Sequence, residues 1–356
     1  MPIDTPESLR GHIELAMRVE LSTIPPYLFA MYSIEDQSSD AAMLIRSIVA
    51  EEMLHAALAT NLLLAVGGNP SYGDRTYVPA YPMDLPHHRP PLNLELAPCS
   101  LETIHDVFMR IEQPEAHDAP PEPDEYESLG QFYHALEIGL EQVDEGYDVF
   151  QKPQVEAQMS NPSYYRPVTF DFEDSGGLMV IDDLESAVDA IEIIIHQGEG
   201  LSDDRWADPN HQELTHYHKL VQIFEGRSPL GSVVPLRRNP KTADYPDQIR
   251  VVSELFNALY RGIYLTLGQI FGGESDQQRA VGLLYLVMGD LMSQTAQFLV
   301  GQDLRDGTFA APTFEYYEFT DDSAVEEVRA LAERAANHFP EMISVRDAIE
   351  GLSLIF

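Results

Sequence analysis

Apolar residues recur at helical spacing through most of this 356-residue chain. At the amino end, Thr5 and Pro6 supply a capping residue and a first-turn proline, and Leu9, Ile13 and Met17 follow at intervals of four residues. Residues spaced in this way lie on one face of an α-helix. The pattern therefore predicts that the chain opens with a long amphipathic helix.

The same periodicity predicts a succession of helices and no regular strands. Pro- and Tyr-rich loops without a period separate some of them, above all at residues 69–100 and 114–124. Such long irregular segments are often functional. The class is therefore all-α, with helices expected at about 5–34, 39–66, 101–112, 125–150, 181–197, 209–226, 247–271, 275–300 and 324–338.

A linker that contains Pro and Arg, residues 229–245, divides the predicted helices into two groups. We expect a helical bundle over residues 1–228 that carries the functional site. We expect residues 229–356 to contain the linker and a helical extension that packs on the bundle. Because the helical pair predicted at 247–271 and 275–300 is apolar, the extension is also a candidate surface for a homo-oligomer.

Composition narrows the classes of partner. The formal net charge is −38, which disfavours binding to nucleic acid or to anionic lipid. The amino end lacks a basic region followed by an apolar run, and no stretch approaches an unbroken membrane span. The single cysteine, Cys99, excludes an intrachain disulfide and is expected to be a small buried residue. We therefore expect a cytoplasmic protein with a small-molecule substrate.

Two Glu-x-x-His sequences are the strongest chemical signal. Glu52 and His55 lie three residues apart inside the apolar helix predicted at 39–66, and Glu213 and His216 repeat the spacing downstream. Side chains three apart on a helix point the same way, so a carboxylate and an imidazole can hold one cation together. A buried ionised carboxylate is costly without a metal or a counter-charge. Each pair therefore indicates either metal ligands or a buried ion pair.

Single acids on other apolar faces supply further candidate ligands. Glu20 is the only acid on the stripe of the first helix, and Pro25 and Pro26 just after it predict a kink or bulge there. On the helix at 125–150, Glu137 shares a face with Tyr133. A surface acid is the competing interpretation for Glu137.

The sequence leaves open which carboxylate near the fourth long helix would complete the ligand set. Glu199 follows an apolar helix and stands between two glycines, a setting that packing does not explain. We expect Glu199 and His216 near the site, with Glu213 as the alternative carboxylate. His196 and His218 rank below them.

Together these candidates match a known arrangement. In the carboxylate-bridged di-iron and di-manganese bundles of the ferritin-like fold, two helices give one Glu each and two give Glu-x-x-His. Carboxylates with imidazoles favour Fe or Mn, here one or two ions. Tyr27, Tyr133 and Tyr217 are the candidate catalytic residues, as donors of hydrogen bonds or electrons. The competing hypothesis is a bundle whose buried acids pair with His or Arg and bind an organic ligand.

The chain also resembles the ferritin-like iminophenyl-pyruvate dimer synthase family over residues 8–226. Residues 247–315 are similar to the helical extension of that family. The order and spacing of several short sequences carry the resemblance: Val19–Leu28, Glu51–His55, Gly67–Pro70, Ile111–Glu115, Gln197–Gly200 and Thr215–Tyr217.

The resemblance implies a ferritin-like four-helix bundle and an enzyme of secondary metabolism. Members of the family couple two molecules of an oxidised, tryptophan-derived imine in pigment and alkaloid biosynthesis. By this similarity, Glu20, Glu52, His55, Glu199 and His216 are the positions to test.

Three functions remain open at this point. The first is a metal-dependent oxidase or oxygenase acting on a small, amino-acid-derived aromatic substrate. The second is a metal-free or haem-assisted imine-coupling enzyme, and the third is a non-catalytic binding or storage bundle.

Overall fold

The structure is a computed structural model that describes residues 3–86, 88–114, 126, 128–166, 176–198, 214–273, 276–320 and 323–351. Over these ranges the elements are helical except for one short antiparallel pair, β1 (Met83–Asp84) and β2 (Asn93–Leu94). The all-α class predicted from the sequence is confirmed.

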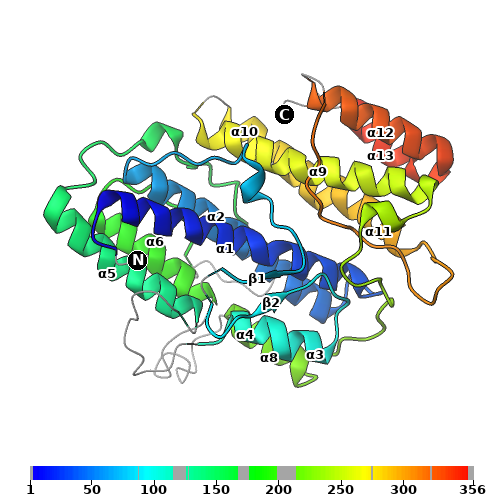
Figure 1. Cartoon of the computed structure of the whole chain (residues 1–356), viewed down its shortest axis with the longest axis horizontal. Helices are drawn as coiled ribbons and strands as arrows, with labels where there is room; N and C mark the ends of the chain where they lie inside the picture. The colour runs from blue at the N-terminus through cyan, green and yellow to red at the C-terminus, as the bar shows by residue number, and fades with distance from the viewer. Residues whose placement is uncertain are drawn as a thin grey trace.

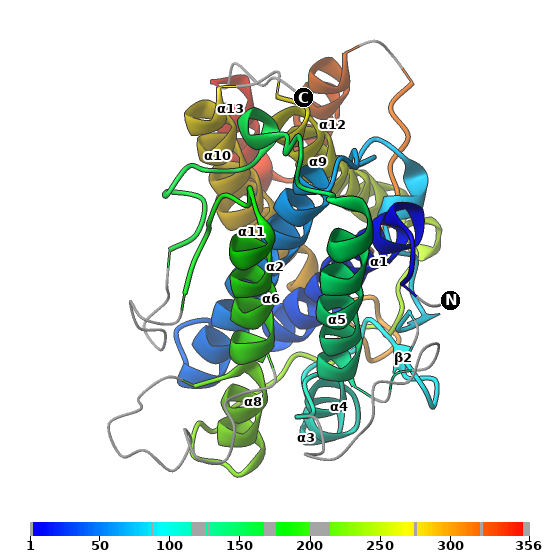
Figure 2. The same ribbon diagram turned by 90° about the vertical axis from the view of Figure 1, so that its left-hand side faces the viewer.

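Four helices form an antiparallel bundle (Figures 1 and 2). Helix α1 packs along α2 and α5, and α6 packs against both α2 and α5, so that the four helices enclose a common core. Their apolar faces meet there, as the periodicity predicted. The bounds of these helices are α1 (Pro6–Ser33), α2 (Asp40–Ala65), α5 (Leu129–Tyr147) and α6 (Leu184–Gly198).

Shorter elements cover one end of the bundle, and a second group of helices packs along its side. At the end lie α3 (Leu101–Thr103), the π-helical turn η2 (Ile104–Phe108), α4 (Met109–Ile111) and α8 (His216–Phe224). The second group comprises α9 (Asp247–Phe271), α10 (Gln277–Leu284), the π-helical turn η5 (Tyr285–Leu291), α11 (Met292–Val300), α12 (Ala324–His338) and α13 (Ile343–Glu350). Single 3₁₀ turns are η1 (Arg75–Tyr77), η3 (Val155–Ala157), η4 (Thr242–Asp244) and η6 (Pro340–Met342).

Helix α1 runs without interruption through Pro25 and Pro26, where the sequence predicted a kink or bulge. Pro26 has no N–H to donate to the carbonyl of Ser22 one turn earlier. The hydroxyl of Tyr81, in the long loop after α2, donates to that carbonyl at 2.6 Å. A tertiary hydrogen bond therefore replaces a helical one, and the helix continues.

Helix α2 is apolar because it is the central helix of the bundle. It and the continuous segment Gln277–Val300 are long and apolar enough to cross a membrane by length and composition, which is weak evidence. Most of α2 is buried inside the protein. Its hydrophobicity is thus accounted for by the core.

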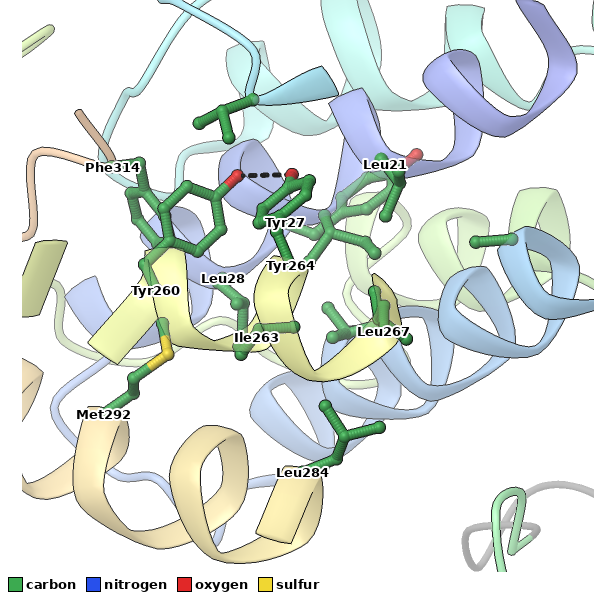
Figure 3. Close-up of a cluster of buried hydrophobic side chains, with 14 of the residues drawn as sticks. Leu21, Tyr27, Leu28, Tyr260, Ile263, Tyr264, Leu267, Leu284, Met292 and Phe314 are labelled. Atoms are coloured by element: carbon green, nitrogen blue, oxygen red, sulfur yellow. Dashed lines mark hydrogen bonds between the residues drawn. The ribbon is translucent and has the colours of Figure 1, made fainter. Parts of the chain in front are cut away.

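The carboxyl-terminal helices share their core with the bundle. Figure 3 shows Leu21 and Leu28 of α1 against Tyr260, Ile263 and Tyr264 of α9, with the two tyrosine hydroxyls hydrogen-bonded at 2.9 Å. Buried apolar residues of both regions form one continuous cluster. The α9 helix therefore packs on the bundle, while the predicted division into two domains at residue 228 stays a prediction.

The start of α5 and the presence of α13 differ from the sequence-based expectation. Helix α5 begins at Leu129, capped by the Ser128 side chain, rather than near residue 125. Helix α13 follows α12 and was not predicted, because it is only eight residues long. Short helices are stabilised by packing more than by their own sequence.

Candidate metal centre

A cluster of buried acids and imidazoles lies between the helices, with α2 at its middle. Glu52 and His55 are on one face of α2, as predicted, and Glu20 faces them from α1. The Nδ1 atom of His55 lies 3.4 Å from Oε2 of Glu20. The hydroxyl of Thr23 lies 2.8 Å from Oε2 of Glu52. The first three predicted ligands are therefore brought together.

His216 reaches the same cluster from α8. Its Nδ1 atom lies 3.2 Å from Oε1 of Glu52, and its ring stacks on that of His55 with centroids 5.3 Å apart. One ligand atom each from Glu52, His55 and His216 can be chosen so that all three lie within 4.8 Å of one another. These three residues could hold a metal ion.

The cluster contains a carboxylate that we did not predict. Glu112 caps the carboxyl end of α4, and its Oε2 atom lies 3.3 Å from Nδ1 of His216. Tyr27 of α1 donates a hydrogen bond to the other oxygen of Glu112. The only sequence signal was the run Ile111–Glu115, which contributed to the family resemblance. Nothing in the periodicity marked Glu112 as buried.

The structure corrects the predicted placement of Glu137, and the catalytic role of Tyr133 stays a prediction. Tyr133 of α5 donates a hydrogen bond to Glu20. Glu137 lies outside the cluster: its carboxylate is partly exposed and contacts His134 at 3.8 Å. The inward face of α5 passes through Tyr133, Leu136 and Leu140. Glu137 is one residue beyond Leu136, which is about 100° around the helix.

The remaining predicted positions are only partly described. Glu199 and Glu213 lie outside the described residues. Helix α8 begins at His216, with Thr215 as its N-cap. Tyr217 is half-buried, and the contact that the structure gives it is between its ring and that of His218.

The outer nitrogens of both imidazoles face acceptors outside the carboxylate cluster. Nε2 of His55 lies 2.9 Å from Oε1 of Gln197, and Nε2 of His216 lies 3.0 Å from Oε2 of Glu51. In His55, Gln197 favours the proton on Nε2, so that Nδ1 faces Glu20. In His216, Nδ1 faces Glu52 and Glu112, and without a metal it carries a proton that it donates to a carboxylate. Imidazoles that turn one nitrogen inward and the other toward an outer acceptor have the arrangement of metal-binding histidines.

Glu51 is buried against Lys219. The ammonium of Lys219 lies 2.5 Å from Oε2 of Glu51, and both side chains are inaccessible to solvent. No local pattern pointed to Lys219, which lies one turn after His216.

Comparison with known proteins agrees with this geometry. A family model described as ferritin-like matches residues 13–225. The chain belongs to the ferritin-like family. This confirms the ferritin-like fold predicted from the sequence.

Two curated relatives of this ferritin-like chain are named as a synthase and a dimerase. It is 24% identical to dichlorochromopyrrolate synthase of Lentzea aerocolonigenes over 89% of this chain and 36% of the relative. It is 25% identical to 2-imino-3-(indol-3-yl)propanoate dimerase of Chromobacterium violaceum over 74% of this chain and 28% of the relative. The chain thus spans about a third of the length of these relatives. The resemblance stated from the sequence motifs is confirmed.

A solved structure is also similar. A ferritin-like protein from Caulobacter vibrioides aligns with a TM-score of 0.59 and 26% sequence identity, covering 82% of this chain and 96% of that one. The agreement extends over more of the chain than the family model does. It therefore includes helices beyond the ferritin-like bundle.

The charges in this ferritin-like cluster are strongly coupled. Burial raises the pKa of Glu52 well above its usual value, and the neighbouring carboxylate of Glu20 raises it further. Burial opposes ionisation of Glu20 too, but its contacts with His55 lower its pKa. Burial would lower the pKa of His216, yet Glu112, Glu51 and Glu52 raise it well above the usual range. Without a metal, the site therefore holds protons where a cation would neutralise the carboxylates.

A small cavity adjoins the carboxylates and is bounded by α5 and α6. Glu20, Glu52, His55 and Glu112 form its polar side, with Tyr133 and Gly198 among the other lining residues. A Cβ atom on Gly198 would stand 3.6 Å from Oε2 of Glu112. The absence of a side chain at Gly198 keeps this side of the cluster open.

Proposed function

We propose that this ferritin-like chain is a metal-dependent oxidoreductase that acts on a small aromatic molecule. The observation that carries the proposal is the orientation of the two imidazoles. Each turns Nδ1 toward buried carboxylates, while Nε2 faces Gln197 or Glu51. An ordinary buried ion pair does not require two imidazoles set in this way.

Five residues would hold the metal: Glu20, Glu52, His55, Glu112 and His216. Their oxygen and nitrogen donors suit Fe or Mn better than a metal that prefers thiolates. A bound Fe or Mn ion supplies one-electron redox chemistry toward an oxidant such as O2. The protein excludes bulk water, because all five side chains are buried.

Two tyrosines are placed to hold protons beside the reacting centre. The hydroxyl of Tyr27 donates to Glu112, and that of Tyr133 donates to Glu20. Burial raises the pKa of both phenols well above the usual value, and the two carboxylates raise it further. Both hydroxyls therefore stay protonated at neutral pH, fix the carboxylate rotamers and can act as proton donors. The catalytic role of Tyr217 stays a prediction.

The substrate class follows from the names of the relatives. An indolyl iminopropanoate is a small, amino-acid-derived aromatic imine, and we propose a substrate of this class. Joining two such molecules through carbon removes one hydrogen from each. The two electrons and two protons must then pass to an oxidant, and reduction of O2 to hydrogen peroxide balances them.

The word dimerase in one relative's name favours a second candidate. In this alternative the chain couples imines without a protein-bound metal, or with haem, and the buried acids move protons. A Soret absorption band in the purified protein, or turnover that survives exhaustive chelation, would support the alternative and contradict the first proposal.

Metal analysis of purified protein and of two matched variants tests the first proposal. We expect stoichiometric Fe or Mn in the wild type and at least a tenfold loss of affinity in Glu52→Gln, a range reported even for supporting residues of metal sites. Glu137→Gln is the control, because Glu137 lies outside the cluster. Equal metal content in folded Glu52→Gln and wild-type protein would refute the proposal.

A further inference from the structure

The two imidazoles of the candidate centre have chemically different outer partners. Nε2 of His55 lies 2.9 Å from the amide oxygen of Gln197, which is next to the last residue of α6. Nε2 of His216 lies 3.0 Å, an ion-pair distance, from Oε2 of Glu51 on α2. Gln197 and Glu51 are both buried. One imidazole therefore faces a neutral amide and the other a carboxyl group.

The carboxyl group of Glu51 is ionised. Burial alone would raise its pKa, but the ammonium of Lys219 and the imidazole of His216 lower that pKa to about 2. Nζ of Lys219 lies 2.5 Å from the same Oε2 atom that contacts His216. His216 and Lys219 are three residues apart and so lie on one face of α8. Glu51 thus contacts that face at two points and holds α8 against α2.

Consecutive residues of α2 contact the two nitrogens of the His216 ring. Oε1 of Glu52 lies 3.2 Å from Nδ1, and Oε2 of Glu51 lies 3.0 Å from Nε2. Turning the ring by half a revolution would put a carbon atom in the place of each nitrogen and lose both contacts. The ring of His55 is fixed in the same way, because it too has an inner and an outer partner. Each outer partner therefore helps to select the orientation that turns Nδ1 toward the cluster.

We propose that each imidazole is held for metal binding through Nδ1 by its outer partner, which acts as a positioning residue: Gln197 for His55, and Glu51 for His216. This inference rests on the proposed metal-dependent function. An acceptor at the outer nitrogen fixes the ring and raises the basicity of the inner nitrogen. A carboxylate does so more than an amide, because it attracts the proton on Nε2 more strongly. The two imidazoles are thus unequal ligands, and His216 is the stronger donor.

Proton NMR of the full-length protein loaded with Co(II) tests this inference. The paramagnetic ion moves the signal of the proton on the outer nitrogen of a bound imidazole far outside the usual range, and this signal is lost on exchange into D2O. We expect two such signals in the wild type, one from each imidazole. Wild-type protein that binds no Co(II) would overturn the proposed function together with this inference.

Two substitutions at Gln197 separate positioning from packing. Gln197→Leu removes the acceptor and keeps a side chain of similar size. We expect the signal from His55 to be lost to rapid exchange and the affinity for Co(II) to fall roughly tenfold. Gln197→Glu restores an acceptor oxygen, so the signal should return at a new position and the affinity should recover. A folded Gln197→Leu protein that keeps both signals and the wild-type affinity would overturn the assignment of Gln197.

Glu51→Gln keeps the size of the side chain and removes its charge. We expect the signal from His216 to move, that from His55 to stay, and the affinity for Co(II) to fall roughly tenfold. Glu51→Gln combined with Lys219→Met removes both buried charges and is measured beside the single variant, in case the single variant does not fold. Circular dichroism confirms folding, and Glu137→Gln is the control that should move neither signal, because Glu137 lies outside the cluster.

The outcomes at Glu51 separate this inference from the proposed function. If the folded variants that lack the Glu51 carboxylate keep both signals and the wild-type affinity, Glu51 does not position His216 and the inference is overturned. Binding of Co(II) by the wild type would then still leave the proposed function standing.

Discussion

The hydrogen bond from Tyr81 to Ser22 is predicted to hold α1 straight at its two prolines. Replacing Tyr81 with Phe removes the hydroxyl that lies 2.6 Å from the Ser22 carbonyl and preserves the aromatic ring. Ser22 is buried, so water does not replace the lost donor. A buried acceptor left without a partner costs about 1–3 kcal/mol. We expect Tyr81→Phe to lower the free energy of unfolding by that amount.

A double-mutant cycle with Pro26→Ala isolates this effect. An alanine at position 26 supplies an N–H that can donate to the Ser22 carbonyl in the ordinary helical pattern. In that background Tyr81→Phe should cost much less, so the two substitutions should show a coupling free energy of roughly 1–2 kcal/mol. The cycle cancels the effect of removing proline on the unfolded chain.

The assay is urea-induced unfolding of the four proteins, followed by far-ultraviolet circular dichroism. Only transitions that are reversible and share one slope can be compared as free energies. Equal losses from Tyr81→Phe in the wild-type and Pro26→Ala backgrounds would refute the reasoning. They would mean that the hydroxyl stabilises the protein by some route other than replacing the missing helical donor.

Two further predictions concern residues outside the candidate metal centre. Burial raises the pKa of the Cys99 thiol to about 12, so its reaction with a disulfide reagent should stay slow between pH 7 and about 10 in folded protein; rapid labelling near pH 8.5 would contradict this. Asn61 exchanges hydrogen bonds of 2.8–2.9 Å with Met159 and donates to the Met179 carbonyl at 2.8 Å. Asn61→Ala should therefore lower the free energy of unfolding by roughly 3 kcal/mol, and a loss below about 1 kcal/mol in urea unfolding would show that these contacts are replaceable.

Much of the bundle could be predicted because its signals are local. Each signal depends on residues within a few turns of one another. These signals are the apolar stripe and the capping threonine of α1, and the Gly-Gly-Asn-Pro sequence that follows α2. Glu52 and His55 were found for the same reason, since both lie on one helix. Glu20 was found because it interrupts an otherwise apolar face.

Helix irregularities were harder to predict, because they depend on distant groups. Two adjacent prolines predict a break in α1, but the Tyr81 hydroxyl comes from a loop more than fifty residues away and allows the helix to continue. Similarly, Ser128 rather than an earlier residue starts α5, since the cap is decided by which side chain reaches the free N–H groups.

The composition of the cluster also depended on tertiary structure. Periodicity tells which residues of one helix share a face, but not how far that helix is rotated against its neighbours. At about 100° per residue, this rotation decides that Leu136 rather than Glu137 faces inward. Periodicity also cannot show that Glu112, at the end of a short helix, contacts His216 from another part of the chain.

The sequence by itself therefore determined the helical bundle and the half of the candidate centre that lies on α1 and α2. Only the tertiary structure decided that Glu112 joins these residues and that Lys219 neutralises Glu51. The physical reason is that helix formation and amphipathicity are set over a few residues. Charge pairing in a core is set by atoms that approach within about 3 Å only after the helices have packed.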